Sequence, residues 1–187
     1  MNGSAFGCVK NTIRLRSGRY FDFIDPQADQ FTIEDIAGAL SKICRFGGQI
    51  ERFYSVAEHS CLCAQVALDD GLNLDALKAV FLHDAAEAFC GDVVKPLKVM
   101  LPEYGVVEKR VERVIQDKFG VDFEAQRKHV VEIDRGMLMA ERRALFTPDK
   151  VTWAGENEAR RLTVQPCGWL PVEAEAQFLR WADELWN

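Results

Sequence analysis

Two of the three histidines in the sequence, His59 and His83, lie in a region where we expect two consecutive helices. His59 follows an expected helix start by four residues, and His83 is followed directly by Asp84. Imidazole nitrogens and carboxylate oxygens are the ligand types of divalent transition metals. Side chains of adjacent helix positions are separated by about 100° around the axis, so His83 and Asp84 can lean toward one point. These residues predict a metal site.

The first helix of this region should begin at Ser55. Ser55 and Glu58 form an S-x-x-E capping box, which is a helix-start signal. The apolar residues of this helix recur at helical spacing, and His59 falls within their stripe. They are Val56, Cys63 and Val66. A polar imidazole is therefore expected on a face that points into the core.

In the second helix, two carboxylates continue an apolar face. Leu77 and Val80 are followed at the same spacing by Asp84 and then Glu87. Burying a carboxylate without a partner is costly, and a bound cation is the most economical partner here. Glu87 lies one turn beyond His83 and Asp84, so we expect it to contact a metal-bound water.

A later helix, expected from residue 123 to 146, repeats the pattern with Asp134, our fourth ligand. The other residues of its face are Val130, Met137, Leu138 and Glu141. Arg135 or Arg142 pairing with Asp134 is the alternative. The recurrence of a polar residue on the apolar face of three helices favours the metal. Glu141 either supports one of the metal ligands from behind or, as we favour, pairs with an arginine.

The ordered set His59, His83-Asp84 and Asp134 resembles the HD-domain metal-dependent phosphohydrolases, whose pattern is H…HD…D. Residues 83–87 (HDAAE) and 91–98 (GDVVKPLK) look like the HD-x-x-E and GD-x-x-x-P-x-K motifs of bacterial 5'-deoxynucleotidases. Residues 40–60, with ICRFGGQ and FYSVAEHS, are similar to small phage and prophage HD enzymes, including phage dATP triphosphohydrolases. The matching motifs run from about Arg14 to Asp134.

This resemblance implies an all-α fold, an HD-domain helical bundle, preceded here by a short N-terminal β-hairpin. It also implies a metal-dependent hydrolase of small deoxyribonucleotides. We favour a dNTP triphosphohydrolase or phosphatase, with dATP as the leading substrate. The alternatives are a 5'-deoxyribonucleotidase that releases phosphate from dNMPs, and a non-catalytic nucleotide or metal sensor. The ligands suit Mn, Co, Zn, Fe, Ni or Mg, and a triphosphate can bring a second Mg or Mn.

The resemblance also gives roles to residues that follow the metal ligands. Glu87 would carry a proton to or from the reacting oxygens, and Asp92 would share that work. Lys98 and Lys95 lie on an expected loop next to the site, where each can place a positive charge on phosphate. The family pattern favours Lys98 over Lys95. Solvated loop charges are the alternative for both lysines.

Arg45 is the remaining phosphate candidate. It lies at the end of an expected helix, before Gly47-Gly48, and a guanidinium can bind phosphate through two parallel hydrogen bonds. The alternative is an exposed arginine near a helix C-terminus. Contacts to the base and sugar should come from aromatic residues, and the choice among Phe46, Phe53, Phe89 and Trp153 stays open. Phe46, next to Arg45, is counted with the substrate-binding residues.

Length and composition allow one domain that spans residues 1–187. Hydrophobic residues make up 48% and charged residues 28%, which is ordinary for a globular protein. The net charge of -6 argues against a nucleic-acid polymer or a membrane surface as partner. The sequence has no stretch of 18 apolar residues and no C-x-x-C pair, so we expect a cytoplasmic protein with free cysteines. We also expect a homo-oligomer.

Secondary structure outside the site follows from turn and capping signals. We expect a hairpin within residues 11–23 and helices over 32–43, 103–119 and 173–187. Residues 148–172 contain several Gly, Pro and Trp residues and should be irregular. Residues 1–10 carry no pattern.

Overall fold

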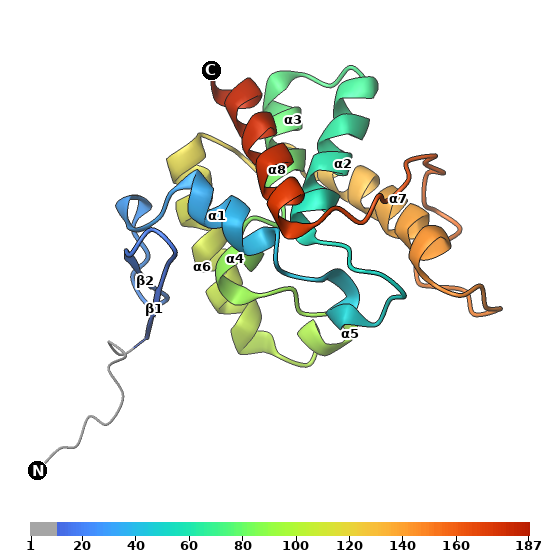
Figure 1. Cartoon of the computed structure of the whole chain (residues 1–187), viewed down its shortest axis with the longest axis horizontal. Helices are drawn as coiled ribbons and strands as arrows, with labels where there is room; N and C mark the ends of the chain where they lie inside the picture. The colour runs from blue at the N-terminus through green and yellow to red at the C-terminus, as the bar shows by residue number, and fades with distance from the viewer. Residues whose placement is uncertain (1–10) are drawn as a thin grey trace, which may run out of the picture.

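The computed structural model describes residues 11–187 and is mostly helical, with one two-stranded antiparallel sheet (Figure 1). The prediction of a helical architecture with a short hairpin is confirmed at this level. The expectation for residues 1–10 lies outside the described residues.

The hairpin pairs β1 (Thr12–Arg14) with β2 (Tyr20–Asp22). Phe21 of β2 is fully buried, and its ring stacks on that of Phe89 at a centroid distance of 4.1 Å. A short 3-10 turn, η1 (Ala28–Gln30), follows. The hairpin is therefore part of the core beside α4 (Glu87–Cys90), which carries a candidate site residue at its first position.

Helix α1 (Ile33–Leu40) begins at the N-cap Thr32, as predicted, but ends three residues earlier than expected. Beyond it, the backbone becomes extended and pairs with the residues before α2 (Val56–Asp69). Val56 N–H donates to the Ile43 carbonyl, and Arg45 N–H donates to the Tyr54 carbonyl. Between the paired stretches lies the 3-10 turn η2 (Arg45–Gly48). This pairing fixes Arg45 and Tyr54 beside each other at the start of α2.

The second expected helix is broken. Helix α3 (Leu74–Leu82) ends with His83 as its C-cap, residues 83–86 form a turn, and Glu87 opens the separate helix α4. The prediction that Asp84 and Glu87 continue the apolar face of one helix is therefore wrong. Glu87 is nevertheless buried, with 6% exposure, and the Asp84 side chain is 20% exposed.

The remaining helices lie close to their predicted positions. Helix α5 (Lys95–Lys98) is a single turn in what we expected to be a loop. Helix α6 (Pro102–Phe119) ends at Gly120 in the left-handed conformation, as a glycine C-cap requires. Helix α7 (Arg127–Leu145) begins four residues later than expected, and α8 (Pro171–Trp186) closes the chain. Residues 146–170, between the last two helices, contain neither helix nor strand, in agreement with the prediction.

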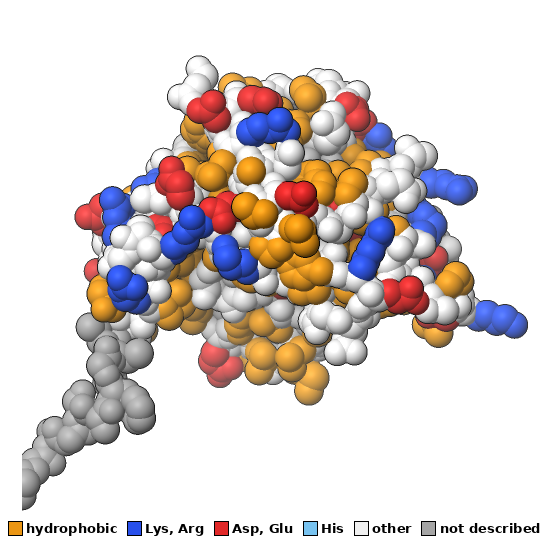
Figure 2. Space-filling model, in the orientation of Figure 1, with side chains coloured by type: hydrophobic (Ala, Val, Ile, Leu, Met, Phe, Trp, Pro, Cys, Tyr) orange, Lys and Arg blue, Asp and Glu red, His pale blue; other side chains and the backbone are white. Residues whose placement is uncertain are grey.

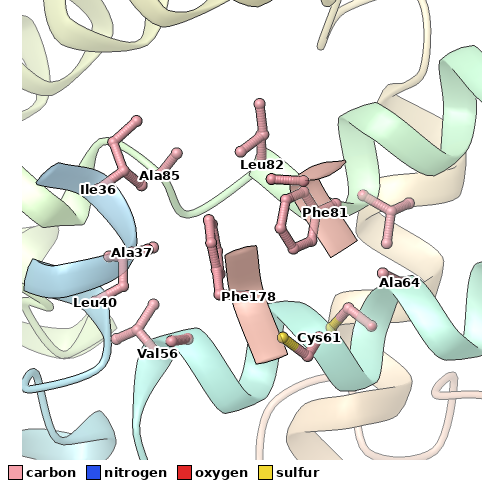
Figure 3. Packing of buried hydrophobic residues seen from close by; sticks show 14 of the residues in the cluster. Ile36, Ala37, Leu40, Val56, Cys61, Ala64, Phe81, Leu82, Ala85 and Phe178 are labelled. Atoms are coloured by element: carbon pink, nitrogen blue, oxygen red, sulfur yellow. The ribbon is translucent and has the colours of Figure 1, made fainter. Parts of the chain in front are cut away.

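Helix α2 is at the centre of the molecule, where it packs against α3, α7 and α8, while α1 packs against α8 and α4. Figure 3 shows Phe178 of α8 between the α1 side chains and Phe81 of α3. Phe178 and Phe81 are fully buried, with ring centroids 4.3 Å apart. Burial of each such side chain contributes roughly 1.5–3 kcal/mol. This packing holds α2, and with it His59, in a fixed position.

The surface carries both signs of charge, interspersed over the face seen in Figure 2. Hydrophobic side chains gather at the lower edge of this face, where Figure 1 places α5 and the start of α6. Val99 and Met100, between these two helices, are more than three-quarters exposed. Among residues 11–187, none of the helices combines the length and the hydropathy that a bilayer crossing needs.

Candidate metal centre

His59, His83 and Asp134 place three ligand atoms within 4.8 Å of one another. The Nε2 atoms of the two histidines are 3.3 Å apart, and Asp134 Oδ1 lies 3.5 Å from Nε2 of His59 and 3.8 Å from Nε2 of His83. Two ligand atoms bound to one tetrahedral ion at ordinary metal–nitrogen distances are about 3.4 Å apart. The three side chains, from α2, the end of α3 and α7, therefore have the spacing of a metal site.

The hydrogen bonds of the two imidazoles direct the same nitrogen of each ring to this point. Nδ1 of His83 lies 2.7 Å from the Val80 carbonyl, which can only accept, so Nδ1 donates. Nδ1 of His59 lies 2.5 Å from Oε1 of Glu141 and donates in the same way. This assignment follows from the hydrogen-bond partners. If both rings are neutral, their Nε2 atoms are both acceptors, and they lie 3.3 Å apart. Their lone pairs repel each other unless a proton or a cation lies between them.

Asp84, the remaining predicted ligand, lies at the edge of this group. Its Oδ2 is 3.5 Å from Nε2 of His59 and 3.3 Å from Nε2 of His83, yet it does not belong to the set of mutually close ligand atoms. The same oxygen accepts a hydrogen bond from Nη1 of Arg45 at 3.1 Å. Asp84 is thus shared between the histidines and an arginine.

The electrostatics of the group favour positive charge. Burial opposes protonation of His83, but the carboxylates of Asp84 and Asp134 outweigh it and hold the pKa of His83 well above its usual value. For Asp134, burial opposes ionisation, but hydrogen bonds from His59 and His83 hold its pKa well below the usual range. The pKa of Asp84 is also lowered against burial, first by His83. Protons or a metal ion can supply the charge that these carboxylates attract.

Arg45 occupies a different environment from the one predicted. Its side chain is only 10% exposed, and its guanidinium lies between two carboxylates. Nη1 contacts Asp84, and Nη2 is 3.3 Å from Oε2 of Glu141, which is fully buried. The prediction that Arg45 ends a helix is wrong, because α1 ends at Leu40 and the Arg45 backbone pairs with Tyr54 instead. A contact between Arg45 and phosphate stays a prediction.

A comparison with known proteins places this chain among bacterial relatives. The protein named "Uncharacterized protein YfdR", from Escherichia coli (strain K12), is 39% identical over 141 residues, which cover 75% of this chain and 76% of that protein. This chain belongs to the YfdR family. An uncharacterized protein of Rhodobacter capsulatus is 34% identical over 113 residues, or 58% of each chain. No protein-family model matches the chain.

In this member of the YfdR family, a carboxyl group with a raised pKa belongs to the segment that follows the candidate ligand His83. Glu87 is 6% exposed, and its Oε2 is buried without a hydrogen-bond partner among the described residues. Burial, with smaller effects of the Asp84 and Asp92 charges, raises the pKa of Glu87 to about 9. Burial also raises the pKa of Asp92. Glu87 is therefore neutral at pH 7 and able to donate a proton.

The two lysines predicted to bind phosphate, Lys95 and Lys98, lie at the ends of α5. Lys98 donates to Oε1 of Glu108 at 2.7 Å, and its ammonium lies 5.5 Å from the ring centre of Tyr104. Lys95, one turn earlier, is exposed. Lys98, which the family pattern favoured, is thus partly neutralised by a carboxylate. Lys95 extends into solvent.

Phe46 is held in an uncommon backbone conformation, with a φ of 58°. A positive φ in a bulky residue costs about 1–3 kcal/mol, and such strain is concentrated at functional positions. Its ring packs edge to face against Phe146 at 5.1 Å and lies 6.3 Å from Trp153. The guanidinium carbon of Arg45 is 5.5 Å from the same ring. Phe46 therefore connects the arginine to the irregular segment after α7.

Two buried residues beside the site, Glu141 and Tyr54, have partners that the sequence did not fully predict. Glu141 stands seven residues after Asp134 on the same helical face, and the sequence favoured an arginine as its partner over a role around the metal. The structure gives it both partners, His59 and Arg45, and a hydrogen bond from Tyr54. The role of Tyr54 has no signal in the sequence, because its position depends on the pairing before α2.

Glu58 also differs from its prediction. Ser55 accepts the Glu58 backbone N–H, as expected for the helix start, but the Glu58 carboxylate does not return to Ser55. It accepts three backbone N–H groups, at 2.5, 3.0 and 2.7 Å, from residues 167–169. Glu58 is fully buried and ties the segment before α8 to the helix that carries His59.

Two open hollows on the surface, of about 620 and 740 Å³, lie apart from this centre. One is lined by parts of α1, α6 and α8, and the other by the start of α7 and residues 158–160. Neither is lined by His59, His83 or Asp134. The candidate site is therefore identified by its donor atoms and not by either of these hollows.

Proposed function

We propose that this chain is a metal-dependent phosphohydrolase of the HD-domain class that acts on deoxyribonucleotides. The observation that carries the proposal is the convergence of His59, His83 and Asp134 from three separate segments, with Asp84 at the edge. The nearby neutral carboxyl of Glu87 adds an acid to the ligands. The likeness of residues 83–98 to deoxynucleotidase motifs supplies the substrate class.

The donor set fits a divalent ion of the Mn, Fe, Co, Ni or Zn series. Two neutral imidazoles and one or two carboxylates are ligands of these metals, whereas sites that bind Mg by itself are built from oxygens. His59, His83 and Asp134 would hold the ion, and Asp84 would join them or bind a metal-bound water. The ion supplies polarisation of a phosphoryl oxygen and a water of lowered pKa.

Glu87 would act as the proton donor to the leaving oxygen. Its carboxyl is neutral at pH 7 because burial and the neighbouring acidic residues raise its pKa to about 9. The buried Oε2 has no competing hydrogen bond among the described residues. Asp92, whose pKa is raised by burial, would assist by exchanging protons between Glu87 and solvent.

Phosphate binding would fall to the basic residues around the centre. Lys95 is exposed, and Lys98 could exchange its Glu108 partner for a phosphate oxygen. Arg45 would contribute without leaving its carboxylates if it contacts phosphate through Nε, which is buried and has no partner among the described residues. A triphosphate, with dATP as the leading candidate, remains our first substrate and a dNMP our second.

The proposal is tested by incubating the protein with each dNTP and dNMP in the presence of Mn²⁺, Co²⁺ or Mg²⁺. The measured products are phosphate, pyrophosphate and tripolyphosphate. We expect turnover of the dNTPs or of the dNMPs with a transition metal. Release of tripolyphosphate would identify a triphosphohydrolase, and release of phosphate from a dNMP would identify a nucleotidase. Glu87→Gln should lose turnover but retain bound metal, whereas Asp134→Asn should lose both. A metal-loaded protein that binds deoxynucleotides and hydrolyses none would refute the enzyme and favour a sensor.

A further inference from the structure

We propose that Glu141, supported by Tyr54, is a positioning residue that fixes the orientation and tautomer of His59 for metal binding. This inference deepens the proposed metal centre and rests on it. It concerns groups that bind no substrate and touch no reacting atom. They act on the cation through the imidazole.

The contacts of Glu141 are confined to the protein interior. Its Oε1 accepts hydrogen bonds from Nδ1 of His59 at 2.5 Å and from the Tyr54 hydroxyl at 2.8 Å. Glu141, His59 and Tyr54 are all fully buried. Oε2 lies 3.3 Å from Nη2 of Arg45, an ion pair without hydrogen-bond geometry. With no water-exposed alternative, the carboxylate is held by these three groups.

This arrangement determines which nitrogen of His59 faces the metal. A buried imidazole can be protonated on either nitrogen, and only the Nδ1-protonated form leaves Nε2 free as a ligand. An ionised carboxylate can only accept, so its contact with Nδ1 selects that form. A hydrogen bond from a ligating histidine to a carboxylate also fixes the ring orientation and raises the basicity of the ligand.

Tyr54 keeps the carboxylate in place. Its backbone is held by the pairing with Arg45, whose N–H donates to the Tyr54 carbonyl at 2.9 Å. The hydroxyl therefore approaches Glu141 from the segment before α2, while Glu141 itself belongs to α7. Through these contacts, the start of α2 and the helix that carries Asp134 are joined behind His59.

Glu58 offers a matched control within the same chain. It is equally buried and is the residue directly before His59, but its carboxylate accepts backbone N–H groups of residues 167–169. Removing its charge should weaken the fold without changing the hydrogen bond to Nδ1 of His59. A general effect of losing a buried carboxylate is thereby separated from an effect on the imidazole.

Zinc affinity, measured by competition with a chromophoric chelator, is the primary assay. We expect Glu141→Gln to weaken Zn²⁺ binding by about 10- to 100-fold, the range for outer-shell partners of metal ligands. Tyr54→Phe removes one neutral hydrogen bond to Glu141 and should weaken binding by about fivefold. Glu58→Gln should lower the midpoint of thermal unfolding and leave the Zn²⁺ affinity within about twofold of wild type.

Nitrogen-15 NMR of the histidines in the zinc-loaded protein gives a second readout, independent of activity. Wild type should show His59 protonated at Nδ1 and zinc-bound at Nε2, and Glu141→Gln should shift the Nδ1 resonance. Unchanged zinc affinity and an unchanged Nδ1 resonance in Glu141→Gln would overturn the positioning role, even with lowered thermal stability, and would leave the proposed hydrolase intact. Failure of wild type to bind zinc, manganese or cobalt would overturn both proposals.

Discussion

Replacing Arg45 by methionine should destabilise the protein strongly, because the guanidinium neutralises two carboxylates in the interior. Nη1 contacts Asp84 and Nη2 faces Glu141, with side-chain exposures of 10% for the arginine, 20% for Asp84 and 0% for Glu141. Methionine replaces the aliphatic part of the arginine side chain but lacks the guanidinium. The substitution therefore removes the charge while keeping most of the apolar packing.

Loss of one partner from a buried ion pair costs about 3–5 kcal/mol, since the remaining charge is neither hydrated nor paired. Asp84 keeps some contact with water, and Glu141 retains its bonds from His59 and Tyr54, so the lower half of this range applies. For a chain of this length, each kcal/mol lowers the unfolding midpoint by about 2–4 °C. A decrease of about 6–16 °C follows.

The assay is thermal and urea unfolding in the presence of a chelator, so that no metal ion replaces the missing positive charge. Arg160→Met is the matched control, because Arg160 pairs with Asp70 at the surface, with side-chain exposures of 41% and 23%. An exposed pair of this kind contributes up to about 1 kcal/mol. Equal losses in the two variants would show that burial of Arg45 does not govern its contribution, and would refute the reasoning.

Three further changes test other parts of the structure. Addition of Mn²⁺ at about 100 times its dissociation constant should stabilise wild type by about 2.7 kcal/mol and raise the unfolding midpoint by about 5–11 °C, while Asp134→Asn shows little shift in the same thermal scan. Because the folded-state pKa of Glu87, about 9, lies above its ordinary value of 4.5, its stabilising contribution is present at low pH and is lost as pH rises through 9. Glu87→Gln should therefore gain stability relative to wild type between pH 6 and 9 in urea unfolding with chelator, and a constant difference would contradict the raised pKa. Phe178→Ala should cost about 3–5 kcal/mol, and a loss below 1 kcal/mol in urea unfolding would show that α8 does not depend on its contact with Phe81.

The sequence was sufficient for the helical architecture and for three of the ligand atoms that converge. Helical spacing placed His59 and Asp134 on apolar faces, and burial of a polar group on such a face requires a partner. Turn and capping residues, such as Thr32 before α1 and Gly120 after α6, marked several helix ends. These signals lie within single helices and their ends, so they can be recognised without knowing which helices pack against each other.

What the sequence could not determine depends on contacts between distant residues. The burial of Arg45 between Asp84 and Glu141 and the bond from Tyr54 to Glu141 bring together residues that are far apart in the sequence. The break after Leu82 has no local signal either. The Glu58 carboxylate likewise finds its partners more than 100 residues away. Residue types and local spacing thus determined which side chains can bind a metal. The tertiary structure alone decided which groups orient and neutralise them, because hydrogen bonds and ion pairs in the interior are chosen by three-dimensional proximity.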